Sequence, residues 1–211
     1  MKKCNRWKKA SCAALCAVCL TLGAAVPASA STAFEDVDAK AWYAPAVEKT
    51  VSAGLLSGTG TTTFSPSWAV TRAMAVTVLW RLAGSPAAGQ CTFTDVEEGT
   101  WYAQAVAWAE EKGIASGNGK GLFQPESYVT REQLAVFLYQ YAQDQELDTA
   151  QGKIDLYSDA KEISAWARDG MEHALGAGIL QGSGSKLMPQ KTATRAELAV
   201  MLVRLTTPAM G

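Results

Sequence analysis

The chain has 211 residues, with 19 Lys and Arg against 20 Asp and Glu and a net charge of −1 at pH 7. This balance argues against a general binder of nucleic acid or of anionic membranes, because both partners require a basic field on the protein. The length is sufficient for a sizeable hydrophobic core in one or two domains.

Residues 1–30 have the pattern of a secretory signal peptide. Five cations precede an apolar run over residues 10–26, and Ala28-Ser29-Ala30 supplies the small residues that a signal peptidase recognises. We expect cleavage after Ala30 and export, which leaves 14 basic against 20 acidic residues and a net charge of −6. The apolar run is short for a membrane span and no second one follows, so we expect no membrane span after cleavage. Only Cys91 lies outside this segment, which excludes an internal disulfide and a cysteine-based metal site.

The rest of the chain contains three copies of one pattern. Each copy opens with an aromatic residue followed two positions later by an aspartate, and 37 residues separate the opening aromatic from a threonine in a Thr-Arg pair. We name the copies repeat 1 (residues 34–84), repeat 2 (93–142) and repeat 3 (157–205). One unit of about 50 residues cannot cover its own apolar faces, so we expect the three to pack into a single body.

Each repeat is predicted to form a helix, a glycine-rich loop and a second helix. The first helix begins near a tryptophan and ends twelve residues later at a glycine that can adopt the left-handed conformation. These segments are residues 42–54, 101–113 and 166–178. The loop that follows has paired glycines and closes with the tripeptide "FSP", "FQP" or "LMP".

The second helix of each repeat is predicted to start at the threonine of the Thr-Arg pair, whose side-chain oxygen can cap the helix. Apolar residues four, seven, eight and eleven positions after the threonine form one helix face. Gln133 and Glu197 complete a capping box in repeats 2 and 3, whereas Met74 in repeat 1 cannot. The fold class predicted is therefore all-α, with little or no strand. The capping threonines are Thr71, Thr130 and Thr194.

An arginine follows each capping threonine, where the helix dipole disfavours a cation by about 0.3–1 kcal/mol. One interpretation is a structural ion pair, for example with an aspartate of an opening motif. The other is an anion pocket that joins the arginine to the free N–H groups of the helix start and suits a carboxylate. We favour the pocket, because a structural arginine is better placed at the other end of a helix. The arginines are Arg72, Arg131 and Arg195; the aspartates are Asp36, Asp95 and Asp159.

Other candidate residues have a structural and a binding interpretation. We favour core packing for the tryptophans at the first helices, although they are also candidate sugar platforms. The second glycines of the loops allow close approach of a ligand, but a turn needs them in any case. The three aspartates are interpreted as caps or turn-formers. Trp68, without an aromatic counterpart in repeats 2 and 3, is a candidate for one groove only. The tryptophans are Trp42, Trp101 and Trp166, and the glycines are Gly60, Gly119 and Gly184.

The ordered motifs aromatic-x-Asp, Trp, Gly-x-x-x-Gly-x-Gly, aromatic-x-Pro and Thr-Arg-Ala-Glu resemble those of S-layer homology (SLH) domains, here in three tandem copies from Phe34 to about Leu205. The resemblance implies a pseudo-threefold trimer of helix-loop-helix repeats around a central helical bundle. It also implies that the grooves between repeats bind secondary cell-wall polysaccharide, typically pyruvylated. Only repeat 3 has Thr-Arg-Ala-Glu intact, so we expect unequal grooves, with the groove of repeat 1 the least certain to bind.

No catalytic constellation is apparent: the chain has no Ser/His/Asp set, zinc-protease motif, phosphate loop or mature cysteine nucleophile. We therefore expect a secreted, non-catalytic protein of the bacterial cell wall or S-layer, without cofactor or metal, that binds an anionic wall polysaccharide. The main alternative is a structural S-layer or envelope subunit that acts by contacts with other envelope proteins. A third is an anchor for a separate enzyme.

Overall fold

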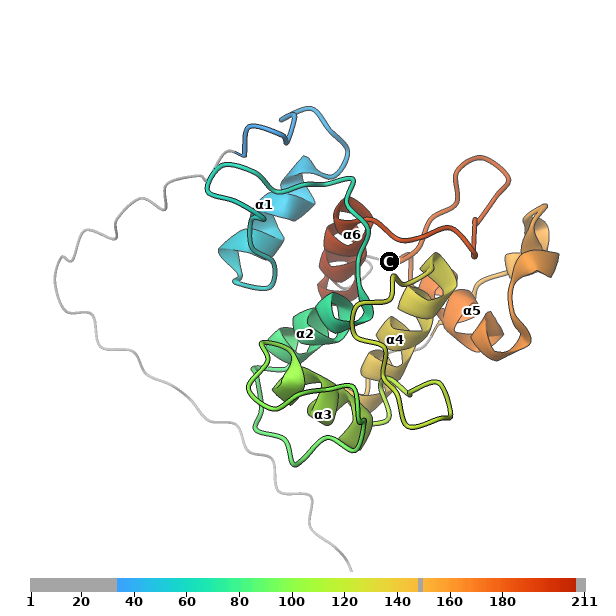
Figure 1. Ribbon diagram of the computed structural model, residues 1–211. Helices are drawn as coiled ribbons and strands as arrows, with labels where there is room; N and C mark the ends of the chain where they lie inside the picture. The colour runs from blue at the N-terminus through green and yellow to red at the C-terminus, as the bar shows by residue number, and fades with distance from the viewer. Residues whose placement is uncertain (1–33, 148–149, 208–211) are drawn as a thin grey trace, which may run out of the picture. The chain divides into compact units, whose positions relative to one another are not determined.

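The computed structural model describes residues 34–147 and 150–207, so the predicted signal peptide lies outside the described residues. These described residues belong to one compact unit. Its α-helices are α1 (Ala44–Ser52), α2 (Arg72–Leu82), α3 (Ala103–Glu111), α4 (Arg131–Asp144), α5 (Arg168–Gly176) and α6 (Arg195–Thr206) (Figure 1). Short 3₁₀ turns at Ile154–Leu156, Ala160–Glu162 and Ala165–Ala167 precede α5. Among the described residues β-pairing is limited to isolated bridges, which confirms the all-α prediction.

The predicted helix ends are confirmed by backbone geometry. The glycines that follow α1, α3 and α5 have positive φ angles of 69°, 66° and 69° at Gly54, Gly113 and Gly178. Each first helix starts two residues after its tryptophan, which therefore lies in the preceding turn. No helix in the described part of the chain combines the length and the apolar character needed to cross a membrane.

The second helices are capped as predicted. The Thr71 hydroxyl accepts a hydrogen bond from the N–H of Met74 at 3.2 Å. Thr130 and Thr194 accept the equivalent bonds, and in both cases the side chain three residues later bonds back to the backbone of the threonine. The capping box is thus present in repeats 2 and 3 and absent from repeat 1, as the sequence indicated.

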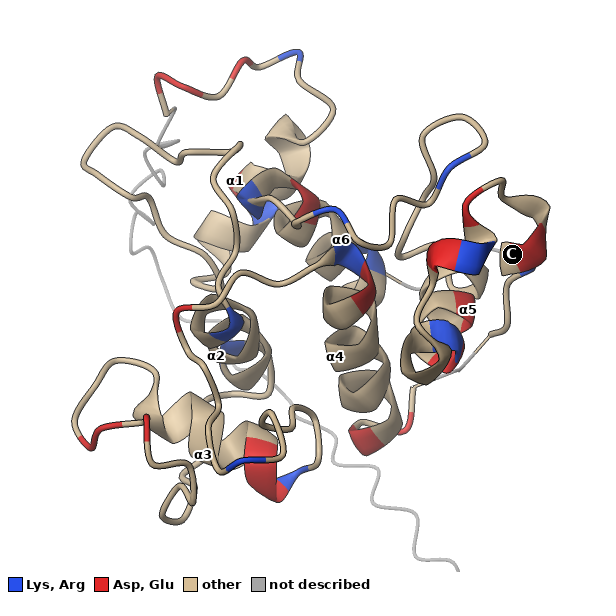
Figure 2. Cartoon of the chain, turned by 45° about the vertical axis from the view of Figure 1, so that its right-hand side comes forward, with Lys and Arg blue, Asp and Glu red and all other residues tan. Residues whose placement is uncertain are grey.

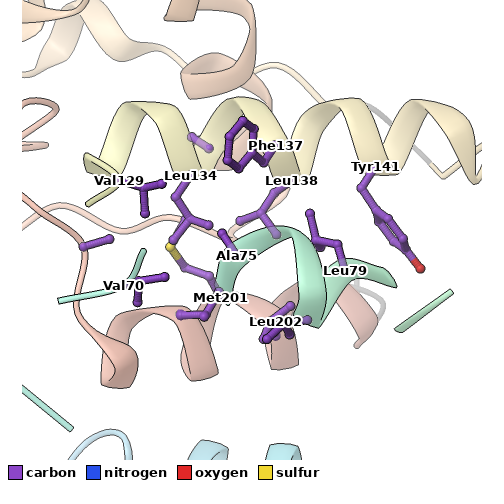
Figure 3. Packing of buried hydrophobic residues seen from close by; sticks show 14 of the residues in the cluster. Val70, Ala75, Leu79, Val129, Leu134, Phe137, Leu138, Tyr141, Met201 and Leu202 are labelled. Carbon is purple, nitrogen blue, oxygen red and sulfur yellow. The ribbon is translucent and has the colours of Figure 1, made fainter. Parts of the chain in front are cut away.

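The core forms where the second helices meet and the first helices cover them. Figure 3 shows Leu138 of α4 near Leu79 of α2, and Leu134 of α4 beside Met201 of α6. Each first helix packs against the second helix of another repeat: α1 on α6, α3 on α2, and α5 on α4. Burial of each large aliphatic side chain contributes about 1.5–3 kcal/mol to the free energy of folding. Because the helices that bury one another come from different repeats, each repeat needs its neighbours to gain this stabilisation.

Backbone hydrogen bonds join the three repeats in a closed cycle. The N–H of Val70 donates to the carbonyl oxygen of Ala193, that of Ala193 to Val129, and that of Val129 to Val70, each at 2.9 Å. All three side chains are fully buried. The cycle lies just before the second helices and joins each repeat to both of the others.

The first glycine of each loop pair lies against the aromatic residue that opens the same repeat. A Cβ on Gly182 would lie 2.5 Å from Cε1 of Tyr157 and 2.8 Å from the carbonyl oxygen of Lys186. We expect Gly182→Ala to lower the free energy of unfolding by about 1–3 kcal/mol, because the ring or the loop must move. Urea unfolding followed by tryptophan fluorescence measures this change.

Gly89→Ala is the matched control, because no heavy atom lies within 4 Å of its added Cβ. This substitution lies in the connection between repeats 1 and 2, and we expect a change within about 0.5 kcal/mol. Equal stability of the two variants would show that contact with Tyr157 does not require glycine at position 182.

Candidate functional site

The arginines of the Thr-Arg pairs bind the loop of the next repeat. Arg195 Nε donates to the carbonyl oxygen of Phe64 at 2.9 Å, and its Nη2 donates to that of Ser57 at 2.6 Å. The guanidinium also lies over the Phe64 ring, 4.4 Å from its centroid. The same pair of bonds joins Arg72 to Phe123 and Ser116, and Arg131 to Leu187 and Gln181. These side chains therefore link repeat 1 to 2, repeat 2 to 3, and repeat 3 back to 1.

The helix starts offer no free N–H groups beside these arginines. At α6 the N–H of Arg195 donates to Trp68 and that of Ala196 to Pro66, both at 2.9 Å, and the N–H of Glu197 donates to Thr194. The starts of α2 and α4 have equivalent carbonyl partners at Ser127 and Pro125, and at Lys191 and Pro189. The expectation that free N–H groups complete an anion pocket with each arginine is therefore wrong. Carbonyl oxygens of a neighbouring repeat already accept hydrogen bonds from the first two N–H groups of each of these helices.

The three aspartates hold the loop of their own repeat. Asp159, which is buried, accepts hydrogen bonds from the N–H groups of Leu187 at 2.9 Å and Met188 at 2.7 Å. Met188 has a φ of 52°, so the carboxylate stabilises a left-handed residue. Desolvation opposes ionisation of Asp159, but these two hydrogen bonds hold its pKa below the ordinary value. Asp36 and Asp95 make the same two bonds, to Phe64 and Ser65 and to Phe123 and Gln124.

The aspartates and arginines meet at the same loop without forming the ion pair considered from the sequence. Asp36 accepts the N–H of Phe64, while Arg195 donates to the carbonyl of that residue. Within residues 34–147 and 150–207, the ion pairs closer than 4.0 Å do not include these aspartates with the Thr-Arg arginines. The carboxylate and the guanidinium instead bind the N–H group and the carbonyl oxygen of the same loop residue.

The tryptophans at the first helices are exposed, so the packing interpretation is wrong. Trp42, Trp101 and Trp166 have 65%, 57% and 59% of their surface accessible, and Trp68 has 60%. Because each first helix begins after its tryptophan, the indole does not lie on the buried helix face. Partly buried Tyr43 packs instead, with its ring edge-on to Trp42 at 5.4 Å.

A groove of about 350 Å³ brings residues of all three repeats together. We call it the Trp42 groove. Trp42 comes from repeat 1 and Arg131 from repeat 2, while repeat 3 contributes the loop at residues 179–183 and the face of α6. Figure 2 shows basic and acidic segments side by side at the start of α6. The charged residues that line the groove are Arg131, Lys191, Glu197 and Arg204.

A carboxylate organises the cations of the Trp42 groove. Oε1 of Glu197 accepts from Nη1 of Arg131 at 3.0 Å and from Nζ of Lys191 at 3.1 Å. Desolvation opposes ionisation of Glu197, but the Thr194 N–H and the two cations hold its pKa below the ordinary value. Glu197 is therefore charged at neutral pH. With three cations and one carboxylate, the groove has a net charge of +2.

The structure brings only part of the predicted site together. Trp42, Arg131 and Glu197 line the Trp42 groove, whereas the predicted glycines do not, and Gly182 lines it in place of Gly184. Sequence reasoning missed Lys191 and Arg204, because neither position carries the same residue type in all three repeats. The capping threonines and the opening aspartates also lie outside this groove. The other candidate glycan-binding residues outside it are Arg72, Arg195, Trp68, Trp101, Trp166, Gly60 and Gly119.

Comparison with known proteins gives one match to the same family model in each repeat. The family model described as S-layer homology domain matches residues 33–75, 92–135 and 156–199, more than half of the chain. The chain is 30% identical over 209 residues to "Surface-layer 125 kDa protein" of Lysinibacillus sphaericus, covering 97% of this chain and 17% of that protein. It is 27% identical over 207 residues to "S-layer protein sap" of Bacillus anthracis, covering 97% and 25%.

A relative with an enzyme name also matches. The chain is 30% identical over 176 residues to "Endoglucanase" of Bacillus sp. (strain KSM-635), covering 82% of this chain and 18% of that protein. The chain therefore spans a quarter or less of the length of these three relatives. The family and the S-layer relatives indicate a cell-wall-binding role and a location at the bacterial cell surface. The chain belongs to the S-layer homology domain family, which is represented here by three tandem copies.

Proposed function

We propose that this chain is a non-catalytic module that binds an anionic, pyruvylated secondary cell-wall polysaccharide through grooves between its repeats. The observation that carries the proposal is the Trp42 groove, where an exposed indole and a net charge of +2 occur together. An indole face supports the apolar face of a sugar ring, and the cations suit a carboxylate. The local positive charge contrasts with the net charge of −6 expected for the exported chain.

The test is retention of residues 31–211 on purified bacterial sacculi, which carry their wall polysaccharide until mild acid removes it. We expect retention on intact sacculi only. Trp42→Ala should weaken binding about tenfold, equivalent to roughly 1.4 kcal/mol, because the sugar loses its aromatic support. Trp166→Ala, at the equivalent position of repeat 3 and similarly exposed, is the matched control and should bind as the wild type does.

Two outcomes would contradict the proposal. Retention that survives removal of the polysaccharide excludes the glycan as the ligand, and unchanged retention of Trp42→Ala excludes the Trp42 groove.

A structural role in an S-layer is the alternative function. Trp68 and Tyr128 are 60% and 63% exposed, beside the segments that join the three repeats, and large exposed aromatics are typical of protein contacts. Relatives named as S-layer proteins agree with this role. Ordered sheets formed by residues 31–211 without sacculi, observed by electron microscopy, would favour it over glycan binding.

A further inference from the structure

We propose that the Trp42 groove is the principal anion-binding groove of the three repeats, and that Lys191 and Arg204 contact the anion. This inference rests on the proposed function and assigns its binding to specific residues. It replaces the expectation that the arginines of the Thr-Arg pairs grip the ligand.

Arg131 is already committed to the protein. Its Nε, Nη1 and Nη2 donate to Leu187, Glu197 and Gln181 at 2.9–3.0 Å. Its side chain is only 6% exposed, and the carboxylate of Glu197 compensates its charge. An incoming anion would have to displace a buried ion pair to reach it, which is costly when one charge is left unpaired.

Unlike Arg131, Lys191 and Arg204 still have N–H donors that can bind a ligand. The side chain of Lys191 is 49% exposed, and one of its three N–H donors is directed to Glu197. Arg204 donates from Nη1 to Ile179 at 3.3 Å and from Nη2 to Gln181 at 2.8 Å, while its Nε has no acceptor among the described residues. Both cations are thus held in place by protein contacts and retain donors for a ligand.

The other repeats lack this pair of cations. Three residues before the capping threonine, repeats 1, 2 and 3 have Trp68, Ser127 and Lys191, and ten residues after it they have Arg81, Gln140 and Arg204. Arg81 donates to Leu55 at 3.1 Å as Arg204 donates to Ile179, so the positions are structurally equivalent. Repeat 1 therefore has one of the two cations, and repeat 2 has neither.

The natural differences between repeats define the experiment. The double variant Lys191→Ser/Arg204→Gln gives repeat 3 the residues of repeat 2. We expect its retention on polysaccharide-bearing sacculi to fall at least about tenfold, because two charge-assisted contacts are lost. Adding Ser127→Lys/Gln140→Arg to this variant should restore binding at least about threefold by moving the cations to repeat 2.

A charge-matched control separates this site from general attraction. Lys120→Ser/Lys161→Gln also removes two exposed cations, and we expect unchanged retention. Urea unfolding verifies that each variant is folded. If Lys191→Ser/Arg204→Gln binds as the wild type does, or if the control weakens binding equally, the inference is overturned. If the wild type itself does not bind polysaccharide-bearing sacculi, the proposed function fails instead.

Discussion

Arg195→Ala is expected to lower the free energy of unfolding by about 3–5 kcal/mol, since it leaves two carbonyl acceptors without their charged donor. Those acceptors, Phe64 and Ser57, lie 131 and 138 positions away in the sequence. The arginine is 6% exposed and also stacks on the Phe64 ring. Its loss removes the side-chain link between the last and the first repeat, and urea unfolding at neutral pH measures the effect.

Two further variants show whether geometry or charge is responsible. Arg195→Lys keeps the charge but cannot supply the forked pair of donors, so we expect an intermediate loss of stability. Arg81→Ala removes an exposed arginine with a single loop contact, and its effect should remain below about 1 kcal/mol. A loss at Arg195 no larger than that at Arg81 would refute the linking role. Alanine at the buried Arg195 therefore tests folding before it tests ligand binding.

Glu197→Gln should lower stability and strengthen anion binding together. Removing the charge leaves Arg131 buried without its carboxylate, which we expect to cost about 2–4 kcal/mol of folding free energy. Glutamine preserves the capping box, as it does in repeat 2, where Oε1 of Gln133 accepts from the N–H of Thr130 at 3.0 Å. The net charge of the Trp42 groove rises from +2 to +3, so retention on polysaccharide-bearing sacculi should increase about threefold.

The stability effect of Glu197→Gln should depend on pH in a defined direction. The folded-state pKa of Glu197 lies below its ordinary value of 4.5, so ionised Glu197 stabilises the fold above that value. This contribution disappears as pH falls through the folded-state pKa. The difference between wild type and variant should therefore shrink between pH 7 and about pH 3. Glu126→Gln, an exposed substitution, is the control.

Weaker sacculus binding by Glu197→Gln would mean that Glu197 contacts the ligand.

Features that depend on neighbours in the sequence were predicted correctly. Thr194 and Glu197 form their capping box within four residues, and Gly178 ends its helix through its own backbone preference. The burial of Trp42 was predicted wrongly, because burial depends on which face a helix from another repeat covers. The arginine pocket was wrong for a related reason. The helix dipole disfavours a cation locally, but carbonyls of the next repeat surround the guanidinium and outweigh that effect.

The all-α class, the three repeats, the helix caps and the family follow from the sequence, because short motifs within each repeat encode them. The shared groove of Trp42, Arg131, Lys191 and Arg204 could be recognised from the three-dimensional structure alone. These residues come from three repeats. The packing of α1 against α6 joins repeats 1 and 3, and the hydrogen bonds of Arg131 to Leu187, Glu197 and Gln181 add repeat 2. The physical reason is that capping acts between residues a few positions apart, whereas a groove depends on how separate helices bury their apolar faces.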